Sequence, residues 1–456
     1  MGNLATPLSV QKLQAALHVK AKGEPGLRFY ALFDKVYRED VLRHAYACCK
    51  ANGGAAGVDG ERFEDIEANG LEQWLGELAK ELKEKRYQPQ AARRVYIPKQ
   101  NGQGLRPLSI PTIRDRTVQT AAKLVLEPIF EADLPDEQHG YRSARNALTA
   151  VRQVHSLLCS GHTHVVDADL SAYFDTVPHV ELFRSVARRV VDRHVLHLIR
   201  MWLETPAEET DERGRKRRTT RNRDMRQGTA QGSPLSPLLA NIYMRRFVLG
   251  WKRLGHERRL RAHIVSYADD LVICCKDSAD EALAAMRDIM SRLKLTVNER
   301  KTHVCRAPEE YFDFLGYTFG RCYSRQTGRA FIGTRPSKKS VSRLLAKNPR
   351  ADGAQSHLAD GRGRGAGRQS DACWLGRLLP AWPGHSGVPV DRSVHHHSAP
   401  PMVAYEASRG QTVDQSVART RAWSGPAAGG AAQLPVGVNM TPRPRAGCGK
   451  SACPVR

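Results

Sequence analysis

Two adjacent aspartates, Asp269 and Asp270, stand between two short apolar runs, residues 263–265 and 271–273. This pattern predicts a β-hairpin over residues 263–276 with the acids at its tip. Neighbouring carboxylates repel each other, and each raises the pKa of the other unless a cation neutralises them. Mg²⁺, which takes oxygen ligands, is the usual solution in proteins. The pair therefore predicts a divalent-cation site at the tip of a hairpin.

A third aspartate, Asp169, ends a second strand pattern, over residues 164–170. The alternative for Asp169 is a surface acidic turn, but the apolar, β-branched run that leads into it favours a buried strand. Two strand-borne acid sites at positions 169 and 269–270 predict a two-metal site for phosphoryl transfer.

The chain of 456 residues is strongly basic, with a net charge of +24 and a pI near 9.9. Such a balance favours a polyanionic partner, most often nucleic acid, over the alternative of a merely solvated basic surface. The ten cysteines include no Cys-x-x-Cys pair, which indicates reduced thiols. A secretory pattern and a long apolar run are both absent from the sequence, so we expect a soluble, cytoplasmic protein with no membrane partner.

Helical and strand periodicities alternate irregularly along the chain, which is typical of an α+β fold rather than a doubly wound sheet. Helices are expected at 9–22, through much of 33–87 with a break at 53–60, at 116–130, twice within 178–201, at 236–249 and at 281–293. Strands are expected at 93–97, 164–170, 263–276 (the acid-tipped hairpin) and 312–319, with 98–104 as a turn-rich loop and 208–226 as a hairpin or loop.

Eight motif blocks follow one another in order. They are Gly57-Val58-Asp59-Gly60; Ile97-Pro98-Lys99 through Arg106-Pro107-Leu108-Ser109-Ile110-Pro111-Thr112-Ile113-Arg114-Asp115-Arg116; Gly140-Tyr141-Arg142; Asp169 to Asp175; Gln227-Gly228 through Asn241; Tyr267-Ala268-Asp269-Asp270; Lys301-Thr302; and Phe314-Leu315-Gly316-Tyr317. A lone Tyr-x-Asp-Asp is a weak signal, but the ordered set is specific. Over about residues 30–345 the chain resembles reverse transcriptases, most closely the bacterial group II intron-encoded reverse transcriptase/maturases.

The resemblance implies a right-hand polymerase with fingers, palm and a truncated thumb. We expect an N-terminal extension at 1–29, fingers at 30–160, a palm with the catalytic hairpin at 161–320, and the start of the thumb at 321–348, whose first helix matches residues 336–345. Residues 349–456 break the family pattern, because Gly, Pro and Arg dominate and no period persists. We expect this irregular tail to be disordered, and a frameshift in a GC-rich gene would give such a composition.

The resemblance also assigns the acids. Asp169, Asp269 and Asp270 are the expected catalytic residues and, with the backbone carbonyl of Leu170, the ligands of two Mg²⁺ ions. One ion would activate the primer 3′-hydroxyl, and the other would neutralise the triphosphate and the pyrophosphate leaving group.

Five further residues are expected to bind the nucleotide. Lys99 and Arg106 flank a glycine-rich loop and suit a triphosphate. A solvated hairpin explains the loop equally well. Phe174 would exclude a 2′-hydroxyl, unless it is an ordinary core aromatic. Gln231 and Gly232 would line the nucleotide and template pocket, unless their segment is only a helix-entry loop.

Four basic residues are expected to contact nucleic acid. Arg114 and Arg116 open a helix and could meet template phosphates or form a charged face, and Arg142 belongs to the Gly-Tyr-Arg block. Lys301 is assigned to the same group, and in the family the corresponding lysine supports the hairpin and the active site; a surface lysine is its alternative. Asp175 is interpreted as structural.

The predicted function is RNA-directed DNA polymerisation, associated with group II intron splicing and mobility. The expected partners are intron RNA as template and splicing substrate, a DNA primer and dNTPs, with homodimerisation left open. Alternatives are an RNA-binding splicing factor (maturase), an inactive truncated pseudo-enzyme, or another bacterial reverse transcriptase such as a retron or diversity-generating enzyme. A His-Asn-His nuclease motif is not found, the P-loop-like residues 447–451 lack the first glycine and a preceding strand, and the histidines at 395–397 have no spaced partner.

Overall fold

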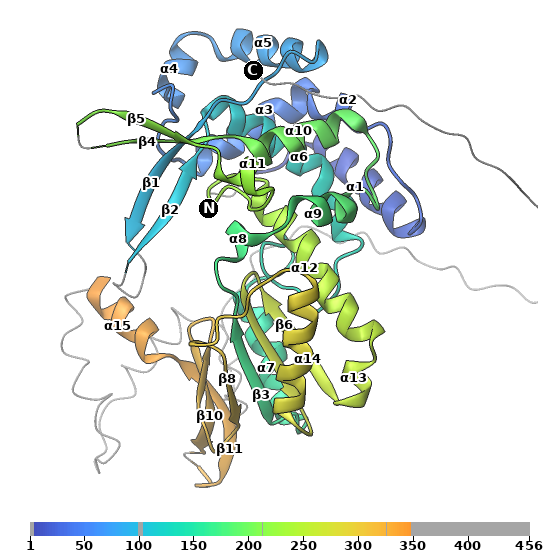
Figure 1. Cartoon of the computed structure of the whole chain (residues 1–456), viewed down its shortest axis with the longest axis vertical. Coiled ribbons are helices and arrows are strands. Elements are labelled where there is room, and N and C mark those ends of the chain that lie inside the picture. The colour runs from blue at the N-terminus through green and yellow to red at the C-terminus, as the bar shows by residue number, and fades with distance from the viewer. Residues whose placement is uncertain (1–3, 99–103, 212, 325, 348–456) are drawn as a thin grey trace, which may run out of the picture. The chain divides into compact units, whose positions relative to one another are not determined.

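The computed structural model describes residues 4–98, 104–211, 213–324 and 326–347. Lys99 and the tail beyond residue 347 therefore lie outside the described residues. The prediction that the tail is disordered concerns residues that the structure does not describe. In the described part, helices and three β-sheets alternate irregularly along the chain (Figure 1). The predicted α+β class is confirmed.

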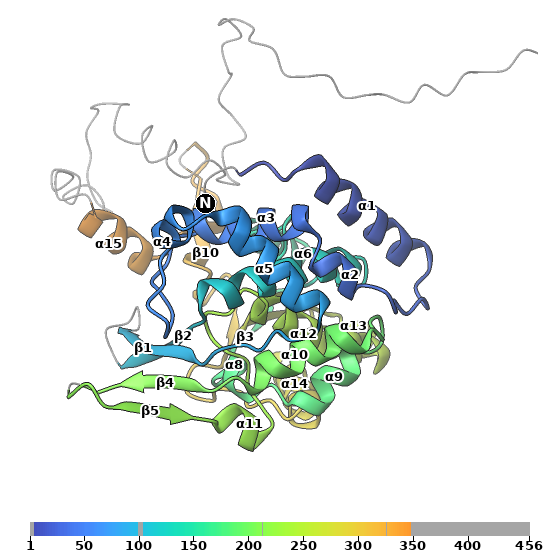
Figure 2. The same ribbon diagram turned by 90° about the horizontal axis from the view of Figure 1, so that it is seen from above.

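A helical layer forms the N-terminal part and surrounds one long buried helix, α6 (Ile113–Glu131). Its other members are α1 (Leu8–Gly23), α2 (Phe33–Val36), α3 (Glu39–Ala51), α4 (Phe63–Ala68) and α5 (Leu71–Lys83). Figure 2 shows this layer from above. Helix α6 starts three residues before the predicted start at 116, because the Thr112 side chain caps it by accepting a hydrogen bond from the Asp115 N–H.

A four-stranded sheet extends from this layer in the order β2-β1-β4-β5. Its strands are β1 (Ala92–Pro98), β2 (Leu105–Ile110), β4 (Ala207–Thr210) and β5 (Lys216–Thr219). Strands β1 and β2 form an antiparallel hairpin, and β1 runs parallel to β4. The sequence predicted β1 but missed β2, and it left 208–226 open between a hairpin and a loop; the structure forms the β4–β5 hairpin followed by α11 (Arg221–Met225).

A second four-stranded sheet carries the acids, in the order β6-β7-β3-β8. Its strands are β3 (His164–Asp169), β6 (Ala262–Tyr267), β7 (Asp270–Cys275) and β8 (His303–Arg306). Alternate residues enter two separate hydrophobic clusters. One contains Val166 and Ile273 with α12 (Ser236–Arg253) and α14 (Ala279–Arg292), and the other contains Val165 and Val272 with α7 (Ala147–Cys159). Helices therefore cover both faces of this sheet.

A three-stranded sheet follows in the order β11-β10-β9. Its strands are β9 (Phe312–Phe314), β10 (Tyr317–Tyr323) and β11 (Ala330–Pro336). The single strand predicted at 312–319 is wrong, because Leu315 (φ 49°) and Gly316 (φ 82°) adopt left-handed backbone and fold the segment into a hairpin. Helix α15 (Lys338–Lys347) follows and agrees with the predicted helix at 336–345.

The remaining helices connect the sheets. They are α8 (Tyr173–Thr176), α9 (His179–Val186), α10 (Arg193–Glu204) and α13 (His256–Arg259). Helices α9 and α10 confirm the two helices predicted within 178–201. Among the described helices, none combines the length and the apolar character that a membrane span requires.

The junction between the helical layer and α10 depends on a buried polar chain. The Tyr87 hydroxyl donates to Asp115 Oδ1 at 2.6 Å and accepts from Trp202 Nε1 at 3.1 Å. We predict that Tyr87→Phe lowers the free energy of unfolding by about 1–3 kcal/mol, because Trp202 and Asp115 each lose a buried partner. Denaturant unfolding measures it, with Tyr30→Phe as control, since Tyr30 is 78% exposed. Equal stability of the two variants would disprove a role for this chain of hydrogen bonds.

Candidate active site

The strand register brings the acids together at one end of the second sheet. Asp169 of β3 pairs directly with Asp270 of β7, and Tyr267 of β6 pairs with Asp270, which leaves Ala268 and Asp269 as a two-residue turn. Ala268 takes left-handed backbone at φ 59°. Carboxylates directly opposite each other on neighbouring strands destabilise a sheet. The three predicted catalytic acids thus form one charged end of the sheet.

The hairpin tip is held by the backbone of residues 137–141. Ser266 donates its N–H to the Glu137 carbonyl at 2.8 Å, and its own carbonyl accepts from the His139 N–H at 2.9 Å. The Asn241 side chain donates to the Gly140 carbonyl at 2.7 Å. A Cβ atom on Gly140 would lie 2.6 Å from the Ala268 nitrogen, so only glycine allows this approach. The Gly-Tyr-Arg block therefore positions the turn that contains Asp269.

Asp169 is fixed by a loop that follows α14. Asn298 Nδ2 and Lys301 Nζ each donate to Asp169 Oδ2 at 3.0 Å, and the Asn298 N–H donates to the Asp169 carbonyl at 2.8 Å. Lys301 was expected among the nucleic-acid contacts; the structure directs its ammonium group to the acid. Leu170, the expected carbonyl ligand, has a buried side chain and lies opposite Val297 in an isolated antiparallel bridge.

Burial, and after it the neighbouring carboxylates, raises the pKa values of Asp269 and Asp270. Burial raises the pKa of Asp270 to about 6, with further contributions from Asp269 and Asp169, although the residue keeps an exposed surface. Burial and Asp169 also raise the pKa of Asp269, against the lowering effect of Arg106 and Lys301. A fourth acid, Asp167, points from the same face of β3, and burial raises its pKa to about 7. The sequence showed Asp167 only as part of the strand.

The donor set suits a hard divalent cation. In the part of the chain that the structure describes, no three His, Cys, Asp or Glu side chains stand close enough to enclose a metal ion as they are. The acids nevertheless offer only oxygen atoms, as Mg²⁺ prefers, and burial followed by the neighbouring carboxylates raises the pKa values of Asp269 and Asp270 although Lys301 lowers both. The residues present therefore fit a divalent ion.

Two of the expected nucleotide-binding residues lie close to the acids. Arg106, exposed on β2, is near enough for its charge to lower the pKa of Asp269. Phe174 is half-buried, with its ring centroid 6.2 Å from that of Tyr141 in an edge-on arrangement. Tyr141 was not predicted as a site residue; it is 46% exposed, and burial and then Asp269 raise the pKa of its hydroxyl. Tyr141 therefore borders the acids, and Phe174 packs against Tyr141.

Gln231 and Gly232 connect the first sheet to the α12 entry loop. The Ser109 N–H of β2 donates to the Gln231 carbonyl at 2.6 Å, and a Cβ atom on Gly232 (φ 112°) would lie 2.4 Å from the Ser109 carbonyl oxygen. Gln231 Nε2 lies 3.2 and 3.3 Å from the two carboxylate oxygens of Asp175. Asp175, interpreted as structural, thus orients the Gln231 amide.

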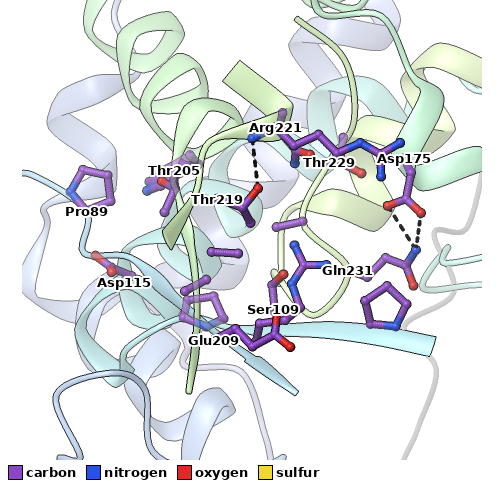
Figure 3. A pocket seen from close by; sticks show the side chains of 18 of the residues that line it. Pro89, Ser109, Asp115, Asp175, Thr205, Glu209, Thr219, Arg221, Thr229 and Gln231 are labelled. Atoms are coloured by element: carbon purple, nitrogen blue, oxygen red, sulfur yellow. Dashed lines mark hydrogen bonds between the residues drawn. The ribbon is translucent and has the colours of Figure 1, made fainter. Parts of the chain in front are cut away.

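A polar pocket of about 310 Å³ adjoins this loop (Figure 3). Gln231, Asp175, Ser109, Glu209 and Arg221 are among the residues that border it. They come from both hairpins of the first sheet, from α8, from α11 and from the α12 entry loop. The sequence did not indicate this pocket, because its lining is assembled from segments more than 100 positions apart.

The other predicted basic contacts are largely internal. Arg116 and Arg142 are each only 8% exposed. Arg116 donates to the Ala55 carbonyl at 3.0 Å, and Arg142 pairs with Glu131 and donates to two backbone carbonyls. Arg114 lies over the Tyr87 ring and pairs with Glu81. These contacts give all three arginines a structural role within the fold.

Comparison with known proteins shows which proteins this chain is similar to. Residues 97–319 match the family described as "Reverse transcriptase (RNA-dependent DNA polymerase)". Protein YkfC of Escherichia coli is 32% identical over 368 residues, which span 73% of this chain and 93% of YkfC. The group II intron-encoded protein LtrA of Lactococcus lactis subsp. cremoris is also 32% identical, over 63% of this chain and 56% of LtrA. A solved telomerase structure from Candida albicans is only weakly similar, at 15% identity and a TM-score of 0.39, covering 59% of this chain and 49% of that chain.

The raised pKa of Asp270 makes stability depend on pH when metal is absent. Its folded-state value of about 6 exceeds its ordinary value of 3.8, so its contribution to stability is present at pH below 4 and is lost as pH rises through 6. We predict that Asp270→Asn, in EDTA, raises Tm at pH 7 by roughly 2–4 °C, and that this gain disappears near pH 4. Calorimetry measures it against Asp280→Asn, an exposed acid on α14. A variant no more stable than wild type at pH 7 would contradict the unfavourable burial and crowding of the Asp270 charge.

Proposed function

This chain belongs to the reverse transcriptases and maturases encoded by group II introns, with their right-hand polymerase fold, and we propose that it extends a DNA primer on an RNA template. The observation that carries this proposal is the strand register, which sets Asp169 opposite Asp270 and leaves Asp269 in the turn between Tyr267 and Asp270. In the reaction, the primer 3′-oxygen forms a bond to the α-phosphorus of a dNTP, and the bond to the pyrophosphate breaks.

Reverse transcriptases as a family use divalent ions, and we infer that Asp169, Asp269, Asp270 and the Leu170 carbonyl hold two Mg²⁺ ions here. Mg²⁺ held by these residues would lower the pKa of the primer hydroxyl and neutralise the charge that develops on the leaving pyrophosphate. Lys301 and Asn298 keep the Asp169 carboxylate in one orientation through their 3.0 Å hydrogen bonds. Preorganisation of this kind avoids rearrangement of charged groups during the reaction.

Other residues of the chain position the nucleotide. Arg106, and Lys99 at the other end of the same loop, would pair with the triphosphate. Phe174, packed edge-on against Tyr141, would lie beneath the incoming sugar and exclude a 2′-hydroxyl. Gln231, oriented by Asp175, would contact the nucleotide or the template base beside it.

We further propose fingers at 30–160, a palm at 161–320 and the start of a thumb at 321–348, with intron RNA as template and splicing substrate. One relative carries "group II intron-encoded protein" in its name, and this chain spans 56% of that protein's length. An RNA-binding splicing factor without polymerase activity is the second candidate. The charge of +24 supports RNA binding in either case, but the strand register that gathers three acids at one end of the sheet favours the polymerase.

We predict that Asp269→Asn abolishes RNA-templated primer extension in Mg²⁺, because an amide cannot neutralise a divalent ion. Extension by the purified full-length chain measures the loss, and circular dichroism and Tm establish that the variant folds. Asp280→Asn, which removes an equal charge from the exposed face of α14, should extend primers normally. Near wild-type extension by the Asp269 variant would refute the assignment of the acids. A wild-type chain that binds RNA but never extends a primer would favour the splicing factor.

We also predict that Phe174→Ala increases incorporation of rNTPs relative to dNTPs by about tenfold or more, which is roughly 1.4 kcal/mol of lost discrimination. Removal of the ring opens the space in which a 2′-hydroxyl would collide. Single-nucleotide kcat/KM ratios measure it, with Phe331→Ala as control, since Phe331 lies on β11 and is 43% exposed. An unchanged ratio would assign Phe174 to the core alone.

A further inference from the structure

A second pocket, of about 360 Å³, lies between α9 and α12, which pack side by side (Figure 1). Six arginines border it: Arg184, Arg188, Arg189, Arg245, Arg246 and Arg253. Asp133 is the one acidic residue among those that line it. We call this cavity the arginine pocket.

Three of the arginines form a rigid inner wall. Arg189 has a side chain only 3% exposed, and its Nη atoms donate to backbone carbonyls of residues 21, 24, 25 and 27. Arg245 Nε donates to the Asp133 carbonyl at 2.8 Å. Arg246 stacks over the Tyr243 ring, 5.4 Å from its centroid. Protein groups therefore fix these guanidinium groups before any ligand arrives.

The other three arginines are exposed at the rim. Within the described residues, the side chains of Arg184, Arg188 and Arg253 make no ion pair and no hydrogen bond to the protein; Arg184 and Arg253 lie in the last turns of their helices. Cations at helix C-termini are favoured by the helix dipole, which is the structural explanation for such residues. Each helix end supplies only about half a negative charge, so it cannot balance the whole group.

The charge of the arginine pocket is poorly compensated. Nε of Arg189 is buried and has no hydrogen-bond partner; it lies 3.3 Å from Asp133 Oδ2 without hydrogen-bond geometry. Burial lowers the pKa of Arg245, and the neighbouring Arg188, Arg253 and Arg189 lower it further, whereas Asp133 raises it. Asp133 lines the cavity, and Glu181 lies near enough to Arg184 for that arginine to lower its pKa. Two carboxylates against six guanidinium groups leave a cavity suited to an anion.

The arginine pocket is separated from the catalytic acids. Helix α12 belongs to the hydrophobic cluster that includes Val166 and Ile273, on one face of the second sheet. Asp169 and Asp270 are an even number of residues from Val165 and Val272, which belong to the cluster on the other face. Side chains alternate between faces along a strand, so the acids and α12 lie on opposite faces. A primer–template duplex at the acids would leave the arginine pocket free.

We propose that the arginine pocket binds the phosphate backbone of an RNA segment distinct from the primer–template duplex. The inference rests on the proposed function in that RNA is the chain's expected polyanion. Arginine forks match phosphate oxygens in a bidentate manner, and a cavity of this size admits a phosphodiester group with part of its ribose. A concave wall also suits a strand that enters it better than a flat membrane surface. Through this site the chain holds folded RNA while the opposite face of the sheet copies a template.

The test replaces only rim residues, so that the inner wall and the fold are kept. Full-length protein with Arg184→Gln, Arg188→Gln and Arg253→Gln is compared with wild type for binding to an RNA stem-loop without primer, over a range of salt. Loss of phosphate contacts should lower affinity roughly tenfold at low salt and reduce the log–log salt slope by about 1 or more. Because the acids lie on the other face, kcat for extension of a short primer–template should not change.

A matched control removes three exposed arginines elsewhere, Arg152→Gln, Arg258→Gln and Arg329→Gln. The proposal predicts a smaller change of slope in this control. Equal slopes in the two triple variants would overturn it, since that result reflects net charge alone. So would a rim variant that loses binding only to phosphatidylserine vesicles. A wild-type chain that binds the stem-loop through the rim arginines but never extends a primer would refute the proposed polymerase and leave the arginine pocket standing.

Discussion

Repulsion among three carboxylates at one end of a β-sheet is the constraint on which the rest of this structure depends. Asp169 and Asp270 are direct neighbours across two strands, and Asp269 stands in the adjoining turn. Placing like charges side by side destabilises a fold, so such groups are usually found where a ligand binds. Burial and then the neighbouring carboxylates raise the pKa values of Asp269 and Asp270, although Lys301 lowers both. A divalent cation held by these acids, as proposed above, would oppose both effects.

The surroundings of the acids are built to resist this repulsion. Apolar residues of β3, β6 and β7 pack into hydrophobic clusters on both faces of the sheet, and this packing opposes separation of the strands. The backbone of residues 137–141 forms hydrogen bonds with the hairpin next to the turn, where Gly140 packs against Ala268. The loop at Asn298 and Lys301 anchors Asp169. Helices, strands and loops from four separate parts of the chain thus converge on one site.

Much of this could be predicted from the sequence, because strand alternation and adjacent acids are local patterns. The hairpin carrying Asp269 and the strand ending at Asp169 formed as predicted. The prediction of a single strand at 312–319 was wrong because two residues with left-handed backbone, one of them Leu315, gave no clear turn signal in the sequence. The burial of Arg116 and Arg142, and the arginine pocket, arise from the packing of distant helices, which a charge pattern along one chain cannot reveal.

The central claim is that the three acids form one divalent-cation site, and Mn²⁺ binding followed by electron paramagnetic resonance tests it most directly. The full-length chain is titrated with Mn²⁺ in the presence of primer–template and a non-hydrolysable dNTP, and Asp169→Asn is titrated in parallel. The account predicts about two tightly held ions in wild type, as two-metal phosphoryl transfer requires, and loss of tight binding in the variant. Equal Mn²⁺ binding by the two proteins would contradict it.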